Sequence, residues 1–265
     1  MRFANVMIGS DPELFIVNNK TGLVVSSIGL IPGKKKEAYR PDGMPKGYGL
    51  QIDNILAEFN IPPVKNKEDF IHHINYMKDY IDNYVKEKNP DLGIKCCASQ
   101  YVPWDQLESE EACLFGCDPD YNVYTEDVNP KPEGDKTNLR SAGTHIHVSY
   151  DNPNIKQSLA LVKCMDLYLG LPSVFMDPDK DRRKLYGKAG SFRMCPYGVE
   201  YRPMSSFFIS NDELIGFLYD STKRAIAHVQ LNLQLPNGDL VQKAINTGDE
   251  KLARELYERY AIKIK

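Results

Sequence analysis

Long uninterrupted runs of apolar residues are missing from this 265-residue sequence. No run approaches the roughly 20 residues that a helix needs to cross a bilayer. Residues 1–8 also lack the apolar core and the small-residue cleavage site of a signal peptide. These absences predict a cytoplasmic protein with no membrane-spanning segment.

A strong positive charge is missing as well. The formal net charge is −3 at pH 7, so there is no electrostatic reason to expect nucleic acid or an anionic membrane surface as a partner. Paired Cys-x-x-Cys motifs, which would hold zinc through thiolates, are absent too. The six cysteines are scattered and are expected to be free thiols: Cys96, Cys97, Cys113, Cys117, Cys164 and Cys195.

Histidine is scarce, yet two of the five histidines lie in the segment Ser141–Ser149. Side chains alternate between the two faces of a strand, so this segment predicts His145, His147 and Ser149 on one face and a packed surface on the other. Two imidazoles on one face can bind a metal ion or a phosphate. The alternative is an ordinary strand edge with two hydrogen-bonded histidines, and the pair alone does not decide between them.

Apolar periodicity predicts both strands and helices along the chain. Strands are expected near residues 13–17, 24–25, 50–61, 94–102, 144–149 and 197–205, and helices over 66–88, 155–171, 210–231 and, in two short pieces around Gly248, 239–261. Asn66 is expected to cap the first helix, and Ser210 with Glu213 to form a capping box for the third. Because Pro12 has no amide hydrogen, we expect it at the first residue of its strand or at a sheet edge.

Several carboxylates occupy strand positions from which they could serve a site. Glu13 is expected at the mouth of the first strand, and Glu58 on the polar face of the strand over residues 50–61. Asp53 is five residues from Glu58, an odd offset, so on one regular strand the two cannot face the same site without a bulge. Glu58 is therefore preferred to Asp53. The alternative for Glu13 is a plain surface charge.

Another strand places Glu200 and Arg202 on one face, where they could serve a site or simply pair with each other. A basic segment over residues 177–193 precedes this strand, and its cations lie beside glycines, as in loops that bind anions. The alternative for this segment is a solvated basic loop. Three carboxylates with an imidazole suit hard divalent cations, and neighbouring guanidinium groups suit nucleotide phosphates, so the combination predicts a phosphoryl-transfer site.

Three stretches, in this order, resemble a known family. Residues 9–15, Gly-Ser-Asp-Pro-Glu-Leu-Phe, look like the opening strand of the phage and bacterial COOH-NH2 ligases. Residues 142–149 are similar to the Gly-x-Gly-Met-His-x-His segment of glutamine synthetases, and residues 198–202 to their Glu-x-Arg strand. The sequence thus resembles the carboxylate–amine ligases of the glutamine synthetase-like fold over most of its length.

The resemblance implies an α+β fold in which a curved, mainly antiparallel sheet carries helices on its convex face. A core over residues 1–210 would be followed by a C-terminal helical segment, 211–265, packed on the same domain. The implied activity is an ATP-dependent ligase that forms an amide through an acyl phosphate, with Mg²⁺ or Mn²⁺. By the same resemblance, the metal ligands would be Glu13, Glu58, His145 and Glu200, the catalytic contacts His147, Arg193 and Arg202, and the nucleotide contacts Arg183, Lys188, Arg193, Asn60 and Ser149.

Two departures from glutamine synthetase limit what the resemblance implies. The extra N-terminal domain and a clear ammonia-site loop are missing, so glutamate and ammonia are not expected as substrates. The expected partners are a small-molecule or peptide carboxylate and an amine, in the host cytoplasm if a phage encodes the protein, with oligomers allowed. Two alternatives stay open: a phosphotransferase like the guanidino kinases of the same fold, and a non-catalytic nucleotide-binding or virion-associated protein.

Overall fold

A mainly antiparallel sheet organises the computed structural model, which describes residues 1–35, 37–113, 120–130, 132 and 137–261. Seven strands follow the order β3-β4-β1-β9-β11-β10-β7, and β2 and β5 pair with β1 in addition. The strands are β1 Met7–Asn18, β2 Val24–Val25, β3 Gly49–Asp53, β4 Leu56–Asn60, β5 Leu92–Lys95, β7 Tyr121–Asn122, β9 Thr144–Ser149, β10 Ser191–Cys195 and β11 Gly198–Tyr201. A small second sheet pairs β6, Ser99–Tyr101, with β8, Leu139–Ser141. The predicted α+β class is confirmed at this level.

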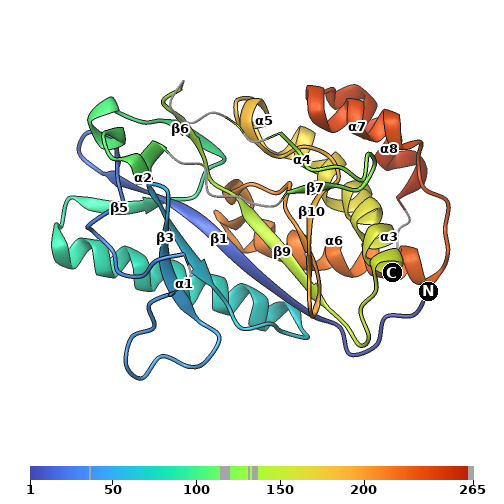
Figure 1. Ribbon diagram of the computed structural model, residues 1–265, viewed down its shortest axis with the longest axis horizontal. Helices are drawn as coiled ribbons and strands as arrows, with labels where there is room; N and C mark the ends of the chain where they lie inside the picture. Colours follow the sequence, from blue (N-terminus) through green and yellow to red (C-terminus); the bar gives the residue numbers. More distant parts are fainter. Residues whose placement is uncertain (36, 114–119, 131, 133–136, 262–265) are drawn as a thin grey trace.

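Helices α1, α3 and α6 cover one face of the large sheet (Figure 1). The long helices are α1 Lys67–Lys88, α3 Ile155–Met165, α6 Asp212–Gln230, α7 Gly238–Thr247 and α8 Glu250–Tyr260; the short ones are η1 Trp104–Leu107, α2 Glu110–Cys113, the π-turn η3 Asp166–Gly170, α4 Leu171–Met176, α5 Arg182–Leu185 and η4 Ser206–Ile209. In the core, alternate strand residues such as Leu14, Ile146 and Val199 pack among apolar side chains of α1, α3 and α6. The other residues of each strand are therefore left for the opposite face.

Strand β1 lies at the centre of the sheet, and its position corrects two expectations. Pro12 is neither first in the strand nor at an edge, because β1 pairs with β4 on one side and with β9 on the other. It is tolerated because its nitrogen faces the β4 side, where the paired register begins only at the next residue, Glu13. Glu13 consequently lies inside the sheet and not at the mouth of a strand.

The strand expected over residues 50–61 is in fact a hairpin. Strands β3 and β4 are joined at Asn54 and Ile55, and Asn54 has a positive φ of 57°. The reversal pairs Gln51 with Glu58 and Asp53 with Leu56. Cross-strand partners share a face, so Asp53 and Glu58 face the same side. The preference for Glu58 over Asp53 assumed one continuous strand, and the turn removes that reason for it.

The helix termini agree in part with the predictions. Asn66 caps α1 by accepting a hydrogen bond from the Asp69 amide at 2.8 Å, as expected. The cap of α6 is Asn211 and not Ser210, because Ser210 is already in the helical conformation that ends η4 whereas Asn211 is extended. Gly248 ends α7 in the left-handed conformation, as predicted for the break between the two last helices.

The second predicted helix continues past residue 171. The stretch Ile155–Met176 is long and apolar enough to cross a membrane by length and composition alone, but 72% of its most apolar window is buried inside the protein. It therefore packs as a core helix of this fold. Five cysteines are free thiols, as expected, and Cys117 lies outside the described residues.

Candidate functional site

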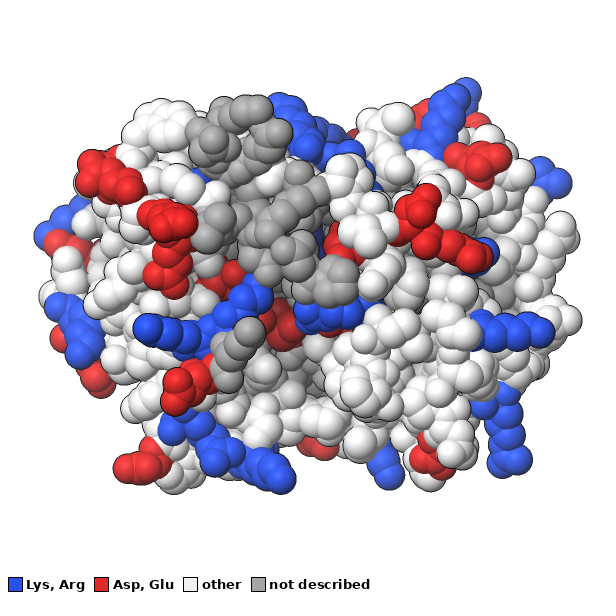
Figure 2. All heavy atoms as spheres, viewed as in Figure 1, with Lys and Arg blue, Asp and Glu red and all other residues white. Residues whose placement is uncertain are grey.

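Strand register brings the charged residues to one face of the sheet, opposite the helices. Glu13 pairs with Glu58, Asp11 with His145, and Glu200 with both His147 and Arg193. Because paired residues point the same way, all of these side chains share a face with Asp53. Figure 2 shows this face, where acidic and basic side chains meet in a hollow near its middle.

An acidic cluster of Glu13, Asp53 and Glu58 forms one half of the site. All three side chains are buried. Burial raises the pKa of Glu13, and it raises that of Glu58 well above its usual value, with a further contribution from the charges of Asp11, Asp53 and Glu13. Glu13 accepts a hydrogen bond of 2.5 Å from the Gly143 amide, while one Glu58 oxygen is buried without a hydrogen-bond partner. Lys35 Nζ lies 3.2 Å from both Asp53 oxygens and supplies one positive charge. A divalent cation would neutralise the charge of the other carboxylates.

An imidazole cluster of Asp11, His145, His147 and Glu200 forms the other half. Asp11 Oδ1 lies 3.1 Å from His145 Nδ1 and 3.0 Å from His147 Nε2, and His145 Nδ1 lies 3.5 Å from Glu200 Oε1. Burial alone would raise the pKa of Asp11, but His147 and His145 outweigh it and hold that pKa well below its usual range. Burial would lower the pKa of His147, and the charge of Asp11 raises it overall.

The imidazole cluster has the ligand atoms for a divalent cation. One atom from each of Asp11, His147 and Glu200 lies within 4.8 Å of the others. Asp11 Oδ1, His145 Nδ1 and His147 Nε2 are buried without a hydrogen bond of good geometry, although they lie within ion-pair distance. Carboxylate and imidazole atoms gathered this closely are a donor set that suits a divalent cation. Asp11 was missed from the sequence, although its spacing of two residues from Glu13 already placed both on one face.

Two arginines balance the charge of Glu200. Arg193 Nε and Nη2 lie 2.7 and 2.5 Å from Glu200 Oε2, and Arg202 Nη1 donates to Glu200 Oε1. Arg202 Nε also lies 3.4 Å from Asp120, a residue just before β7. Glu200 and Arg202 thus pair with each other and also lie in the site, so the two sequence alternatives were not exclusive.

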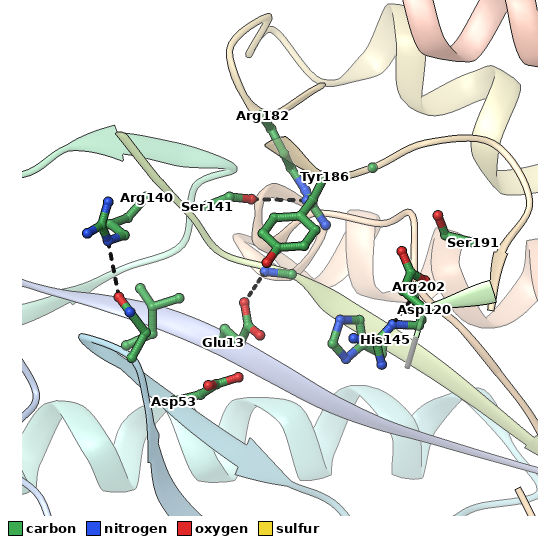
Figure 3. A pocket seen from close by; sticks show the side chains of 14 residues that line it. Glu13, Asp53, Asp120, Arg140, Ser141, His145, Arg182, Tyr186, Ser191 and Arg202 are labelled. Atoms are coloured by element: carbon green, nitrogen blue, oxygen red, sulfur yellow. Dashed lines mark hydrogen bonds and ion pairs between the residues drawn. The ribbon is translucent and has the colours of Figure 1, made fainter. Parts of the chain in front are cut away.

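A cavity of about 40 Å³ opens above the acidic cluster. Glu13, Asp53 and His145 line its floor, and Arg182 and Tyr186 lie over it (Figure 3). Arg182 donates to Ser141 Oγ at 3.0 Å and to the Met204 carbonyl at 2.8 Å. This buried guanidinium faces the cavity and was not singled out from the sequence.

Arg183 and Lys188 do not reach this cavity. Arg183 donates to Ser173 Oγ at 3.0 Å, on the side of α5 that faces α4, and Lys188 Nζ donates to the Arg183 carbonyl at 2.5 Å. Both were predicted as nucleotide contacts, and the structure places them elsewhere. Successive residues of a helix point about 100° apart, so the basic run alone could not tell which arginine faces the site.

A second cavity, of about 320 Å³, lies on the other side of the imidazole cluster. Its lining includes Asp11, Asn60, His147, Ser149 and Tyr197. The Asn60 side-chain oxygen is buried without a hydrogen-bond partner, and Tyr197 shares a hydrogen bond of 2.5 Å with His147. Asn60 and Ser149, both predicted nucleotide contacts, therefore lie together, separated from the acidic cluster by the imidazoles.

Comparison with known families gives a match over about half of the chain. The model of the phage phiEco32-like COOH.NH2 ligases of type 2 matches residues 127–265. This span includes both histidines of β9 and the Glu200–Arg202 pair, while β1 and the β3–β4 hairpin precede it. No curated protein matches the sequence.

Proposed function

Since this chain belongs to the family of phage phiEco32-like COOH-NH2 ligases of type 2, we propose that it is an ATP-dependent carboxylate–amine ligase that works through an acyl phosphate. The ligase class follows from the family. The rest depends on one observation: carboxylates and imidazoles from β1, β4, β9 and β11 converge on a single face of the sheet. We propose a glutamine synthetase-like fold on the same grounds.

The two clusters suit two divalent cations, Mg²⁺ or Mn²⁺. Glu13 and Glu58, with Asp53 beside them, would hold one, and Asp11 and Glu200, with His145 or His147, would hold the other. Oxygen ligands with an imidazole are the donor set of hard cations. Bound cations would neutralise phosphate charge and hold the reacting groups in line.

ATP would bind across the imidazole cluster. Its base and ribose fit the cavity lined by Asn60 and Ser149, where the orphaned Asn60 oxygen can accept a hydrogen bond from an exocyclic amine. The phosphates would then lie toward Arg193 and Arg202, whose forked donors suit phosphate oxygens. Arg193 is the more accessible of the two, since its side chain is 33% exposed against 5% for Arg202.

The carboxylate substrate would lie in the cavity below Arg182. One carboxylate oxygen attacks the γ-phosphorus, and the bond from that phosphorus to the β–γ bridging oxygen breaks, which gives an acyl phosphate and ADP. The amine nitrogen then attacks the acyl carbon and phosphate leaves with its bonding electrons. The proton lost by nitrogen passes to a nearby carboxylate, for which Asp53 or Asp120 is placed in the same cavity. The product is an amide.

ADP release, measured across a panel of carboxylic acids and amines with Mg²⁺, tests this proposal. We expect turnover only when one acid and one amine are both present, with amide and phosphate formed in equal amounts. Glu13→Gln should lower the rate at least 100-fold, while Glu37→Gln, at an exposed carboxylate away from the cavity, should leave it unchanged. A phosphorylated small molecule formed without incorporation of an amine would indicate a phosphotransferase instead. Absence of Mg²⁺-dependent ATP binding by calorimetry would overturn the proposal.

A further inference from the structure

On the helix side of the sheet, a fully buried carboxylate contacts two segments that carry residues of the site. Asp166 Oδ1 accepts a hydrogen bond from the Tyr201 hydroxyl at 2.7 Å, and Oδ2 accepts one from the Tyr124 hydroxyl at 2.9 Å. A carboxyl buried to this degree would be costly without such donors, so the bonds account for its presence in the core.

The local helix geometry leaves room for these bonds. Asp166 begins the π-turn η3, in which the Leu171 amide donates to the Asp166 carbonyl five residues earlier. Such turns are frequent at functional sites. Gly170 ends the turn, and a Cβ there would stand 2.8 Å from the Tyr201 hydroxyl and 3.1 Å from Asp166 Oδ1. The π-turn, with one residue more than an α-helical turn, and the glycine at its end thus both accommodate the contact between Asp166 and Tyr201.

Each tyrosine is joined to a charged residue of the site through its own strand. Tyr201 lies between Glu200 and Arg202 in the sequence. Because side chains alternate along a strand, the Tyr201 ring packs among the helices, and the side chains of Glu200 and Arg202 point into the site. Tyr124 follows β7, and its ring fills the space between Gly190 and Gly238, where an added Cβ would stand 2.8 Å from it in both cases. The same segment carries Asp120, the partner of Arg202.

We propose that Asp166 is a positioning residue: from the buried side of the sheet it fixes Glu200 and Arg202 against Asp120 by holding Tyr201 and Tyr124. Its kinetic consequence rests on the proposed ligase function, but its structural consequence does not. Burial raises the pKa of Asp166 to about 7, although the two hydroxyl donors lower it.

Hydroxyl deletion offers a matched test. Tyr124→Phe and Tyr201→Phe each remove one bond to Asp166, while Tyr168→Phe is the control. Tyr168 lies in the same π-turn and is fully buried, but its hydroxyl contacts His228 Nδ1 on α6 at 3.1 Å. We expect the first two variants to lower kcat for ADP formation at least tenfold and the control less than twofold, at similar losses in Tm. Asp166→Asn, which keeps one acceptor oxygen, should lose less than Asp166→Leu.

Hydrogen exchange separates this inference from the proposed function. The Asn122 amide donates to the Asp127 carbonyl, and the Val123 and Arg202 amides donate to the Gly190 and Ser191 carbonyls at the start of β10, the strand that pairs with both held segments. Exchange of these amides should quicken at least fivefold in Tyr124→Phe or Tyr201→Phe but not in Tyr168→Phe. That result in a protein without any ligase turnover would support the inference and count against the ligase. Equal exchange and equal kcat in all three tyrosine variants would overturn the inference, even with the wild type fully active.

Discussion

At the scale of single residues, the two consecutive arginines of α5 have the same chemistry but lie in different surroundings and bind different partners. Arg182 is buried over the cavity and holds Ser141 and the Met204 carbonyl, whereas Arg183 holds Ser173 on the far side of the helix. The difference arises from the rotation of one residue along a helix. Of these two arginines, Arg182 is therefore the one that we expect to contribute to the function of the site.

Exchanging each arginine for lysine tests this difference. Arg182→Lys loses the forked donors that reach two acceptors at once, so kcat/KM for ADP formation should fall at least 100-fold. Arg183→Lys should stay within threefold of the wild type and lose about 1 kcal/mol of stability through one weakened hydrogen bond. Steady-state kinetics and urea unfolding measure both effects. Equal kinetic losses in the two variants would contradict the assignment of Arg182 to the cavity.

Alternation along single strands predicted several site residues correctly as neighbours on a face. His145 and His147 needed only the period of two on β9, and Glu200 with Arg202 needed the same period on the next strand. Asp11 and Glu13 obey this rule as well, so Asp11 could have been predicted. Asp120 could not, because its place depends on a short strand, β7, that pairs with β10 far along the chain.

At the scale of elements, turns decided which predictions failed. The β3–β4 turn at Asn54–Ile55 lacks the glycine of common hairpin turns, so the segment read as one strand and Asp53 was assigned to the wrong face. Asn54 instead adopts the left-handed conformation that asparagine tolerates, and its side chain donates to the Ala112 carbonyl at 2.8 Å. A turn fixed by a distant contact leaves little local signal.

Gly198 fixes the pairing of β11 with β9, and a substitution there tests how far the site depends on this register. Its φ is 151°, and an added Cβ would stand 2.1 Å from the Val148 carbonyl oxygen. We expect Gly198→Ala to lose about 3 kcal/mol of stability and to weaken MgATP binding at least tenfold, because Glu200 must shift from His147. Thermal unfolding and calorimetry measure the two effects.

Gly216→Ala is the matched control for that substitution. Gly216 lies within helix α6, and an added Cβ there would meet side-chain atoms of Lys67 and Ile71 on α1 only at 3.5 and 3.7 Å. Alanine is favoured over glycine in a helix interior by about 1 kcal/mol, so this variant should gain stability and bind MgATP as the wild type does. Unchanged binding in Gly198→Ala would show that the site tolerates a broken β9–β11 pairing.

At the scale of the whole molecule, the site depends on contacts between distant parts of the chain. Strand β1 meets β4 about 45 residues later and β9 more than 130 residues later, through Glu13 and Asp11 respectively. Periodicity specifies the face of each strand but not its neighbour. The composition of the site was therefore predictable in large part, whereas the division into an acidic and an imidazole cluster required the strand order.

That division makes stability depend on pH and on metal. The pKa values of Glu13 and Glu58 are raised by burial, and that of His147 is raised by Asp11. A group whose pKa is higher in the folded state binds its proton more tightly there, so stability falls as pH rises through the folded pKa. For all three groups the sign is the same. In the metal-free protein these three groups should therefore add stability as the pH is lowered toward 6, against an opposing contribution from His73 and His228, whose pKa values are lowered by burial.

Divalent cations should reverse this trend. Protons and Mg²⁺ compete for the same carboxylates and imidazoles, so saturating Mg²⁺ should raise Tm more at pH 8 than at pH 6. A ligand at 100 times its Kd stabilises by about 2.7 kcal/mol, which in a domain of this size corresponds to roughly 5–10 °C. Thermal unfolding with EDTA or Mg²⁺ measures the difference at each pH.

Glu58→Gln should flatten the pH dependence of the metal-free protein and reduce the Mg²⁺ effect, because it removes one of the repelling charges that the cation neutralises. A Mg²⁺ effect that is equal at both pH values would mean that the cation binds outside the two clusters.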